Sequence, residues 1–264
     1  RLAQISVGHR AAFDSGFRGH WRRAGGYRLD RLSAGSSFDL ARFVVGSEGT
    51  LVIVTEATVG LVPLPRAKAI AVGHFTSTAA AIAATADALS VLPSAVELID
   101  KTILNLSRQK IEYSQLSSIL EGDPGALLFV TFNGETRAEA SAGVERLAEL
   151  WQRHGHGYCT LRATPEQQVS LLKVRAAGLG LLMAASEGMR RPVAFIEDTA
   201  VDPAQLPAYT ERFSAVLAKH GLGAGFSGHC SVGCLHLRPF MDLPQPTQDA
   251  APRPVPQARR HPAA

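Results

Sequence analysis

Residues 228–239 read GHCSVGCLHLRP and place two histidines, two cysteines and an arginine within ten consecutive positions. The residues that lead into this stretch, 223–228, read as a strand entering a tight turn, and 235–238 alternate as a second strand. Because side chains two positions apart in a strand point to the same face, we expect His236 and Arg238 to share a face. The glycine-containing turn is predicted to fold His229 over His236.

The side chains of this stretch suit metal binding. Imidazole nitrogens are common ligands of zinc, iron and manganese, and thiolates suit softer metals. No CxxC motif is present, so a closed structural zinc site is not indicated, whereas two histidines leave coordination positions open, as a catalytic metal needs. Two alternatives stay open: a structural role for the histidines, and a non-enzymatic metal-binding domain that uses His229, Cys230, Cys234 and His236.

Composition limits the class of protein. The chain has 264 residues, of which 46% are hydrophobic and 19% charged, with a net charge of +4, and this suits a globular protein with a large core and more than one domain. The arginines form no basic stripe, so we expect no nucleic-acid partner. Three cysteines form no disulfide framework, which favours a cytoplasmic location. No run of 18 apolar residues exists, so no transmembrane segment is predicted.

Residues 67–240 alternate between strand and helix patterns. Strands are predicted at 69–75, 96–100, 126–133, 158–162 and 193–200. Helices are predicted at 77–90, 100–108, 136–154, from 164 onward, and at 203–220. This alternation predicts an α+β domain in which helices cover one face of a mostly antiparallel sheet.

The two ends of the chain have a different composition. Residues 1–38 are rich in glycine and arginine and read as loosely ordered, while β-branched runs predict short strands at 51–55 and 58–62. From Pro244 onward the chain is rich in proline, alanine, glutamine and arginine without an apolar period, which predicts disorder.

Residues 46–50, GSEGT, place two glycines around a serine and a glutamate. Such a loop can turn backbone N–H groups toward a phosphate, and the hydroxyls of Ser47 and Thr50 add donors. The alternative is an ordinary glycine turn between two strands. The loop is neither a Walker loop nor a dinucleotide-binding fingerprint.

Several segments, taken in order, resemble a known family. Residues 39–58, DLARFVVGSEGTLVIVTEAT, resemble the flavin-contacting segment of the FAD-linked oxidases, and residues 26–30, GYRLD, resemble the element before it. Residues 95–100 and 193–201 are similar to that family's substrate domain, and 228–239 resembles its two-histidine metal motif. These are vanillyl-alcohol-oxidase-like flavoproteins, which include D-lactate, glycolate and D-2-hydroxyglutarate dehydrogenases.

The resemblance covers residues 24–243 and implies three parts. Residues 1–66 would be the C-terminal remnant of an FAD-binding domain, 67–243 a ferredoxin-like cap domain that binds substrate, and 244–264 a disordered tail. In the family a glycine-rich FAD lobe precedes this region and an acidic third metal ligand follows it. The chain starts at Arg1 without an initiator methionine, and we therefore expect a fragment of a longer protein.

The resemblance also implies roles for individual residues. His229 and His236 would bind a divalent metal, zinc, iron or manganese, beside the flavin. Arg175 would pair with the substrate carboxylate, whose two oxygens match a guanidinium fork, and Arg238 would contact substrate. The alternative for Arg175 is a surface arginine on a helix. The residues that would line the FAD are Gly46, Ser47, Glu48, Gly49, Thr50, Ile53 and Val54.

The activity that the resemblance implies is oxidation of a small D-2-hydroxy acid, such as D-lactate or D-2-hydroxyglutarate, by hydride transfer to FAD with help from the metal. The residues between the two histidines resemble large bacterial members that are fused to an iron–sulfur domain. Such an electron-acceptor module, or the missing FAD lobe, is thus an expected partner. The alternative is a docking module that is inactive without that lobe.

Overall fold

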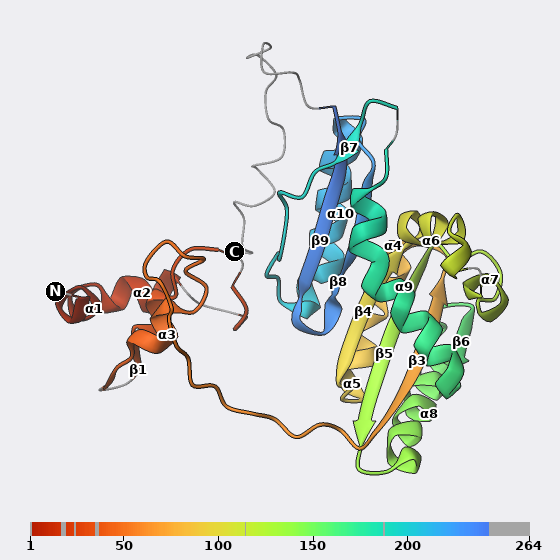
Figure 1. Cartoon of the computed structure of the whole chain (residues 1–264), viewed down its shortest axis with the longest axis horizontal. Helices are drawn as coiled ribbons and strands as arrows, with labels where there is room; N and C mark the ends of the chain where they lie inside the picture. The colour runs from red at the N-terminus through yellow and green to blue at the C-terminus, as the bar shows by residue number, and fades with distance from the viewer. Residues whose placement is uncertain are drawn as a thin grey trace. The chain divides into compact units, whose positions relative to one another are not determined.

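The computed structural model describes residues 2–16, 20–23, 25–34, 37–113, 115–186 and 188–242. The chain divides into two compact units, Arg1–Leu64 and Pro65–Ala264, and each is described by itself (Figure 1). The predicted disordered tail, 244–264, lies outside the described residues.

The first unit contains short helices and one two-stranded pair. Its elements are α1 (Leu2–Gly8), α2 (Arg10–Gly16), η1 (Leu29–Arg31), the antiparallel pair β1 (Ser33–Ala34) and β2 (Ser37–Phe38), and α3 (Leu40–Val44). The expectation of loose order over 1–38 is therefore wrong for the two N-terminal helices. Asp39 caps α3 by accepting a hydrogen bond from the Arg42 backbone N–H, as a short acceptor side chain does at a helix start.

The strands predicted at 51–55 and 58–62 are not formed. Both segments are extended, but neither pairs with another strand among the described residues, and Ile53 and Leu61 are 92% and 90% exposed. β-branched residues favour an extended backbone, but a strand also needs a partner that satisfies its backbone N–H and C=O groups.

The second unit contains a seven-stranded sheet in the order β6-β3-β5-β4-β8-β9-β7, in which every neighbouring pair is antiparallel. Its strands are β3 (Ala67–Phe75), β4 (Ala95–Asp100), β5 (Ala126–Gly134), β6 (Cys159–Arg162), β7 (Arg191–Pro192), β8 (Ala224–His229) and β9 (Cys234–Met241). The chain order of β3 to β6 and their order in the sheet make a ferredoxin-like unit, and β8, β9 and β7 extend it beyond β4. The predicted α+β fold with an antiparallel sheet is confirmed.

Helices lie against both faces of this sheet (Figure 1), whereas the sequence pattern predicted cover on one face. The helical segments of the unit are α4 (Thr78–Ala83), α5 (Thr85–Ser90), α6 (Lys101–Arg108), η2 (Ile111–Tyr113), α7 (Leu116–Ile119), α8 (Arg137–His154), α9 (Pro165–Met183), η3 (Pro203–Gln205), α10 (Leu206–Lys219) and η4 (Cys230–Val232). Ser77, Thr136 and Thr164 cap α4, α8 and α9.

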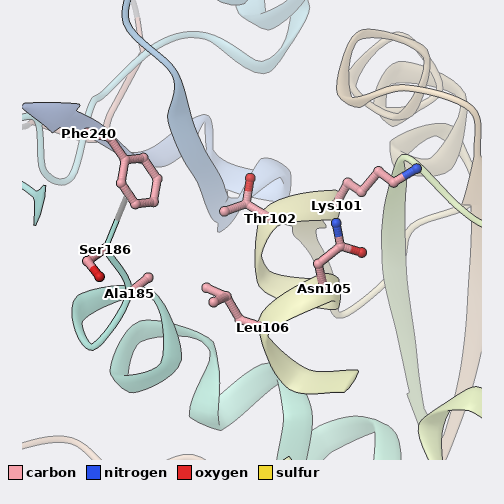
Figure 2. A pocket seen from close by; sticks show the side chains of 7 residues that line it. All are labelled: Lys101, Thr102, Asn105, Leu106, Ala185, Ser186 and Phe240. Atoms are coloured by element: carbon pink, nitrogen blue, oxygen red, sulfur yellow. The ribbon is translucent and has the colours of Figure 1, made fainter. Parts of the chain in front are cut away.

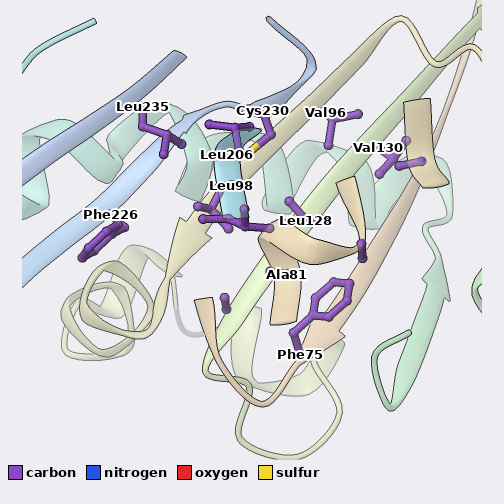
Figure 3. Packing of buried hydrophobic residues seen from close by; sticks show 14 of the residues in the cluster. Phe75, Ala81, Val96, Leu98, Leu128, Val130, Leu206, Phe226, Cys230 and Leu235 are labelled. Atoms are coloured by element: carbon purple, nitrogen blue, oxygen red, sulfur yellow. The ribbon is translucent and has the colours of Figure 1, made fainter. Parts of the chain in front are cut away.

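Two apolar clusters separate the helices by face. Alternate residues of β4 and β5, such as Val96 and Leu128, pack with α4, α5, α8 and α10 in one cluster (Figure 3). Residues on the opposite face of the same strands, such as Ile99 and Phe129, pack with α6, α7 and α9 in the other cluster. Because alternate side chains of a strand point to opposite faces, each strand contributes to both cores. Both faces of the sheet are thus covered by apolar side chains, and a polar site is expected where polar side chains interrupt them.

The strand predicted at 193–200 is wrong over most of its length. Only Arg191–Pro192 forms a strand, β7, and Ile196 makes a single bridge to Leu237 of β9. Asp198 has a φ of 48°, a left-handed conformation that interrupts an extended strand. The segment therefore runs beside β9 without a continuous ladder.

Candidate active site

The hairpin of β8 and β9 brings the two predicted histidines together. His229 pairs with Cys234 and His236 with Ser227 in its register, and the two imidazole centroids lie 5.3 Å apart with perpendicular planes. The turn ends at Gly233, which has a φ of 64° and lies against the Val201 carbonyl oxygen, where a Cβ would overlap it. The predicted folding of His229 over His236 is confirmed.

His229 is held by a carboxylate of the neighbouring strand. Its Nδ1 lies 2.9 and 2.8 Å from the two carboxylate oxygens of Glu97, the residue that faces it in the β4–β8 register. Arg175 of α9 reaches the same carboxylate, with Nη2 2.6 Å from Oε2. Arg175 is therefore placed beside the histidine pair, where its guanidinium binds Glu97.

His236 has a parallel arrangement on the next strand. Its Nδ1 lies 3.0 Å from Oε2 of Glu197 and 3.4 Å from Oδ1 of Asp198. Arg238 places Nη2 2.5 Å from Oε1 of the same glutamate, which agrees with the prediction that His236 and Arg238 share a face. The Arg238 side chain is 5% exposed, and its Nε is buried and has no hydrogen-bond partner within the described part of the chain.

The surroundings favour the charged form of Glu97 and the neutral form of His236. Burial opposes ionisation of Glu97, but the hydrogen bonds from His229 and Arg175 outweigh it and lower its pKa. Burial lowers the pKa of His236, although Glu197 and Asp198 act in the opposite direction. A neutral imidazole is the form that binds a metal.

These residues fit a divalent metal. Each histidine engages a carboxylate through Nδ1, and neither Nε2 has a hydrogen bond within the residues that the structure describes. This is the usual state of a metal-binding histidine, whose second nitrogen donates to a carboxylate. Two imidazoles on one tetrahedral metal, each at about 2.1 Å, place their centroids about 5 Å apart, close to the 5.3 Å found here.

The alternative ligand set with both cysteines is not formed. Cys230 is fully buried within the apolar core, next to Leu206 and Leu235 (Figure 3), and burial raises the pKa of its thiol to about 12. Because a thiolate is needed to bind metal, Cys230 contributes to packing. Cys234 lies closer to the site: Asp198, Cys234 and His236 each offer a ligand atom, all within 4.8 Å of one another.

A separate hollow of about 370 Å³ opens where α6 begins (Figure 2). None of the predicted site residues lines it. Its wall contains Lys101, Thr102, Asn105, Leu106, Ala185, Ser186 and Phe240. The candidate metal ligands therefore lie at the β8–β9 hairpin, away from the walls of this hollow.

The predicted flavin loop belongs to the first unit. Gly46, Glu48 and Gly49 all have positive φ values, and the N–H groups of Ser47 and Thr50 donate to the carbonyls of Val44 and Ser47. The Tyr27 hydroxyl and the Thr50 hydroxyl are 3.0 Å apart. The loop follows a helix and precedes an extended segment, so it is not the turn between two strands of the simpler interpretation.

The residues that complete this site were not predicted. Glu97 and Glu197 lie in the segments 95–100 and 193–201, but their carboxylates were given no role. The available signal was a charge inside an apolar strand: Val96, Leu98 and Ile99 surround Glu97, and a buried carboxylate needs a partner.

No helix among the described residues is long and apolar enough to cross a membrane.

The sequence family described as FAD linked oxidases, C-terminal domain, matches residues 64–255, which is more than half of the chain. The chain belongs to the FAD-linked oxidase family.

Relatives with assigned names carry the comparison further. The chain is 31% identical over 226 residues to a D-2-hydroxyglutarate dehydrogenase of Escherichia coli. The match covers 81% of this chain and 22% of that protein. It is 32% identical over 244 residues to the enzyme of the same name from Pseudomonas putida, and this match covers 88% of this chain and 24% of that protein. A D-lactate dehydrogenase of Archaeoglobus fulgidus is 28% identical to this chain, and the match covers 78% of this chain and 43% of that protein. The chain therefore spans about a quarter of the length of the first two relatives.

Proposed function

We propose that this chain supplies the substrate side of an FAD-dependent site that oxidises a small D-2-hydroxy acid, with a divalent metal held by His229 and His236. The observation that carries the proposal is the pair of imidazoles 5.3 Å apart, each bound through Nδ1 to its own glutamate. The names of the relatives support the substrate class, since 2-hydroxyglutarate and lactate both carry a hydroxyl beside a carboxylate.

A bound divalent metal lowers the pKa of a coordinated hydroxyl, and FAD accepts a hydride. The chain's own residues position the substrate. Glu97 and Glu197 hold the Nδ1–H of the two histidines, which directs each Nε2 toward a common ligand. A guanidinium has five N–H donors, so Arg175 keeps donors for a substrate carboxylate while it binds Glu97.

Arg238 is proposed to contact the same substrate. Its Nη2 binds Glu197, and its buried Nε has no partner among the described residues. A buried donor without a partner costs about 1–3 kcal/mol. A substrate oxygen that accepts from this N–H would remove that cost, which favours binding of an oxygen-rich ligand.

The first unit is proposed to be the remnant of the FAD-binding domain, in which Gly46 to Thr50, with Ile53 and Val54, line the FAD. Its extended segment also favours docking onto an FAD-binding lobe, because Leu61 and Val62 are 90% and 85% exposed and exposed apolar side chains mark interaction surfaces. An iron–sulfur module that accepts the electrons is the second proposed partner.

The test is made on the 264-residue chain. Zn²⁺ and Mn²⁺ binding is measured by titration calorimetry, followed by D-lactate and D-2-hydroxyglutarate with and without metal. We expect the hydroxy acids to bind only with metal, and His236→Gln and Arg175→Gln to lose this binding. After incubation with FAD and desalting, retained flavin that these acids bleach would support the full activity. If His236→Gln and Arg175→Gln both left the affinity for the hydroxy acids unchanged, the proposal would be contradicted.

A further inference from the structure

A second cluster of metal-ligand side chains lies at the end of α8. Asp87 of α5 faces His154, the last residue of α8, and His156, two residues further on. The cluster shares no residue with the site at His229 and His236. Its side chains are 31%, 49% and 24% exposed, so an ion from solvent reaches them.

The two imidazoles converge on one oxygen atom. His154 Nδ1 lies 2.6 Å and His156 Nε2 2.8 Å from Oδ2 of Asp87. The three ligand atoms lie within 4.8 Å of one another, and the ring centroids are 6.2 Å apart. The carboxylate thus lies between the rings, as a third ligand does in a site with two imidazoles.

The backbone around the cluster is fixed by buried contacts. Gly155 has a φ of 70° and ends α8, so the chain reverses between the two histidines. The His156 N–H donates to the Trp151 carbonyl, and the buried Trp151 indole N–H donates to the Ala84 carbonyl, at 2.9 and 3.3 Å. These bonds join the end of α8 to the start of α5, so the arrangement is not left to free surface side chains.

We propose that Asp87, His154 and His156 form a binding site for a divalent transition metal such as Zn²⁺. Two nitrogen ligands and one carboxylate favour zinc, nickel or copper, whereas magnesium and calcium take oxygen ligands. Water completes the coordination.

The bound ion would fasten α5 to the end of α8 and stabilise the folded chain. A ligand that binds only the folded state stabilises it by RT ln(1 + L/Kd), where L is the free ligand concentration, so the melting temperature rises with ligand concentration. This role is independent of the proposed oxidation, since the cluster contains none of the residues proposed to bind the substrate or FAD.

The test begins from the double variant His229→Gln, His236→Gln, which silences the other histidine pair. Equilibrium dialysis against Zn²⁺ is expected to leave one bound equivalent and a raised melting temperature. Adding Asp87→Asn or His156→Gln lowers the Zn²⁺ affinity at least about tenfold, since even an outer-shell change costs that much. Adding His220→Gln, an exposed histidine outside both clusters, is the matched control and leaves the affinity unchanged.

A second measurement needs no change at the hairpin. Titrating Ni²⁺ into the unaltered chain is expected to broaden the amide resonances of Gly155 and Ala88, and Asp87→Asn abolishes this broadening. The proposal would be overturned if the Gly155 resonance did not broaden. It would also be overturned if adding Asp87→Asn and His156→Gln to the double variant left its Zn²⁺ affinity unchanged.

Discussion

The two histidine pairs of the second unit use carboxylates differently. At the hairpin, His229 and His236 each have their own glutamate, and each glutamate has its own arginine. At the end of α8, His154 and His156 share Asp87, and no arginine reaches it within the ion pairs of the described residues. A carboxylate behind a ring orients a ligand, whereas one between two rings is itself in position to bind the ion.

The largest effect is expected for a substitution in the β8–β9 turn, which should separate His229 from His236 and leave the pair of His154 and His156 intact. Gly233→Ala places a Cβ against the Val201 carbonyl oxygen at a positive φ, so we expect a loss of at least about 3 kcal/mol in the free energy of unfolding. Metal binding by His229 and His236 should be lost with it. Urea unfolding and Zn²⁺ dialysis measure both.

The matched control is Gly180→Ala in α9, where nothing lies within 4 Å of the added Cβ. It should stabilise the chain by about 0.5–1 kcal/mol, the difference between alanine and glycine inside a helix. Equal stability of Gly233→Ala and the original chain would show that the turn does not fix the hairpin.

The next effect concerns Asp100, whose carboxylate accepts from the Phe226 N–H of β8 at 2.8 Å and from the Ile103 N–H. Burial raises its pKa from an ordinary 3.8 to about 6, so the fold favours its protonated form. Its contribution to stability is present below pH 3.8 and is lost as the pH rises through 6. A shift of about two pH units corresponds to about 3 kcal/mol.

We therefore expect the original chain to lose up to about 3 kcal/mol relative to Asp100→Asn between pH 4 and pH 7 in urea unfolding. Asp123→Asn gives the opposite sign, because hydrogen bonds from Lys101 and Arg108 lower the pKa of Asp123 and its stabilisation is lost as the pH falls. A pH-independent difference for Asp100→Asn would refute the raised pKa.

A smaller effect sharpens the distinction between orienting and binding carboxylates. Glu97→Gln keeps the shape of the side chain but removes the charge behind His229, so Zn²⁺ affinity at the hairpin should fall about 10- to 100-fold. Calorimetric titration in an Asp87→Asn background reports this site alone. Unchanged affinity would mean that Glu97 does not orient the ligand.

The smallest effect is expected for a carboxylate outside both clusters. Glu145 binds Arg162 at 2.7 Å, and both side chains are about half exposed. Glu145→Gln should change the free energy of unfolding by no more than about 1 kcal/mol, since solvent screens such a pair. Zn²⁺ binding should not change, and a change in it would point to a metal-binding carboxylate that the comparison misses.

Much of the second unit follows from its sequence because the decisive signals are local. Capping residues and helical spacing place α8 and α9, and the glycine-containing turn places His229 near His236. The strand predictions at 51–55 and 193–200 were wrong. β-branched composition indicates a preference for an extended backbone, whereas a strand also depends on a partner that is distant in sequence.

The carboxylates were missed for the same reason. Glu97 meets His229 across 132 positions and Asp87 meets His154 across 67, and no spacing rule reaches so far. Cys230 was weighed as a ligand because it adjoins His229, yet the η4 turn directs it into the core. Residue type pointed to the chemistry of the hairpin, but tertiary structure supplies its partners: the register of β4 with β8 brings Glu97 to His229, and the segment beside β9 brings Glu197 to His236.

The position of β4 in the sheet also has a consequence during synthesis of the chain, because one of its two neighbours is made much later. β4 pairs with β5 on one side and with β8 on the other, and Glu97 is made 132 positions before His229. At about 5–20 residues per second, β4 waits on the order of ten seconds for β8. During that interval the edge of β4 that later pairs with β8 is free, and a free strand edge can pair with wrong partners.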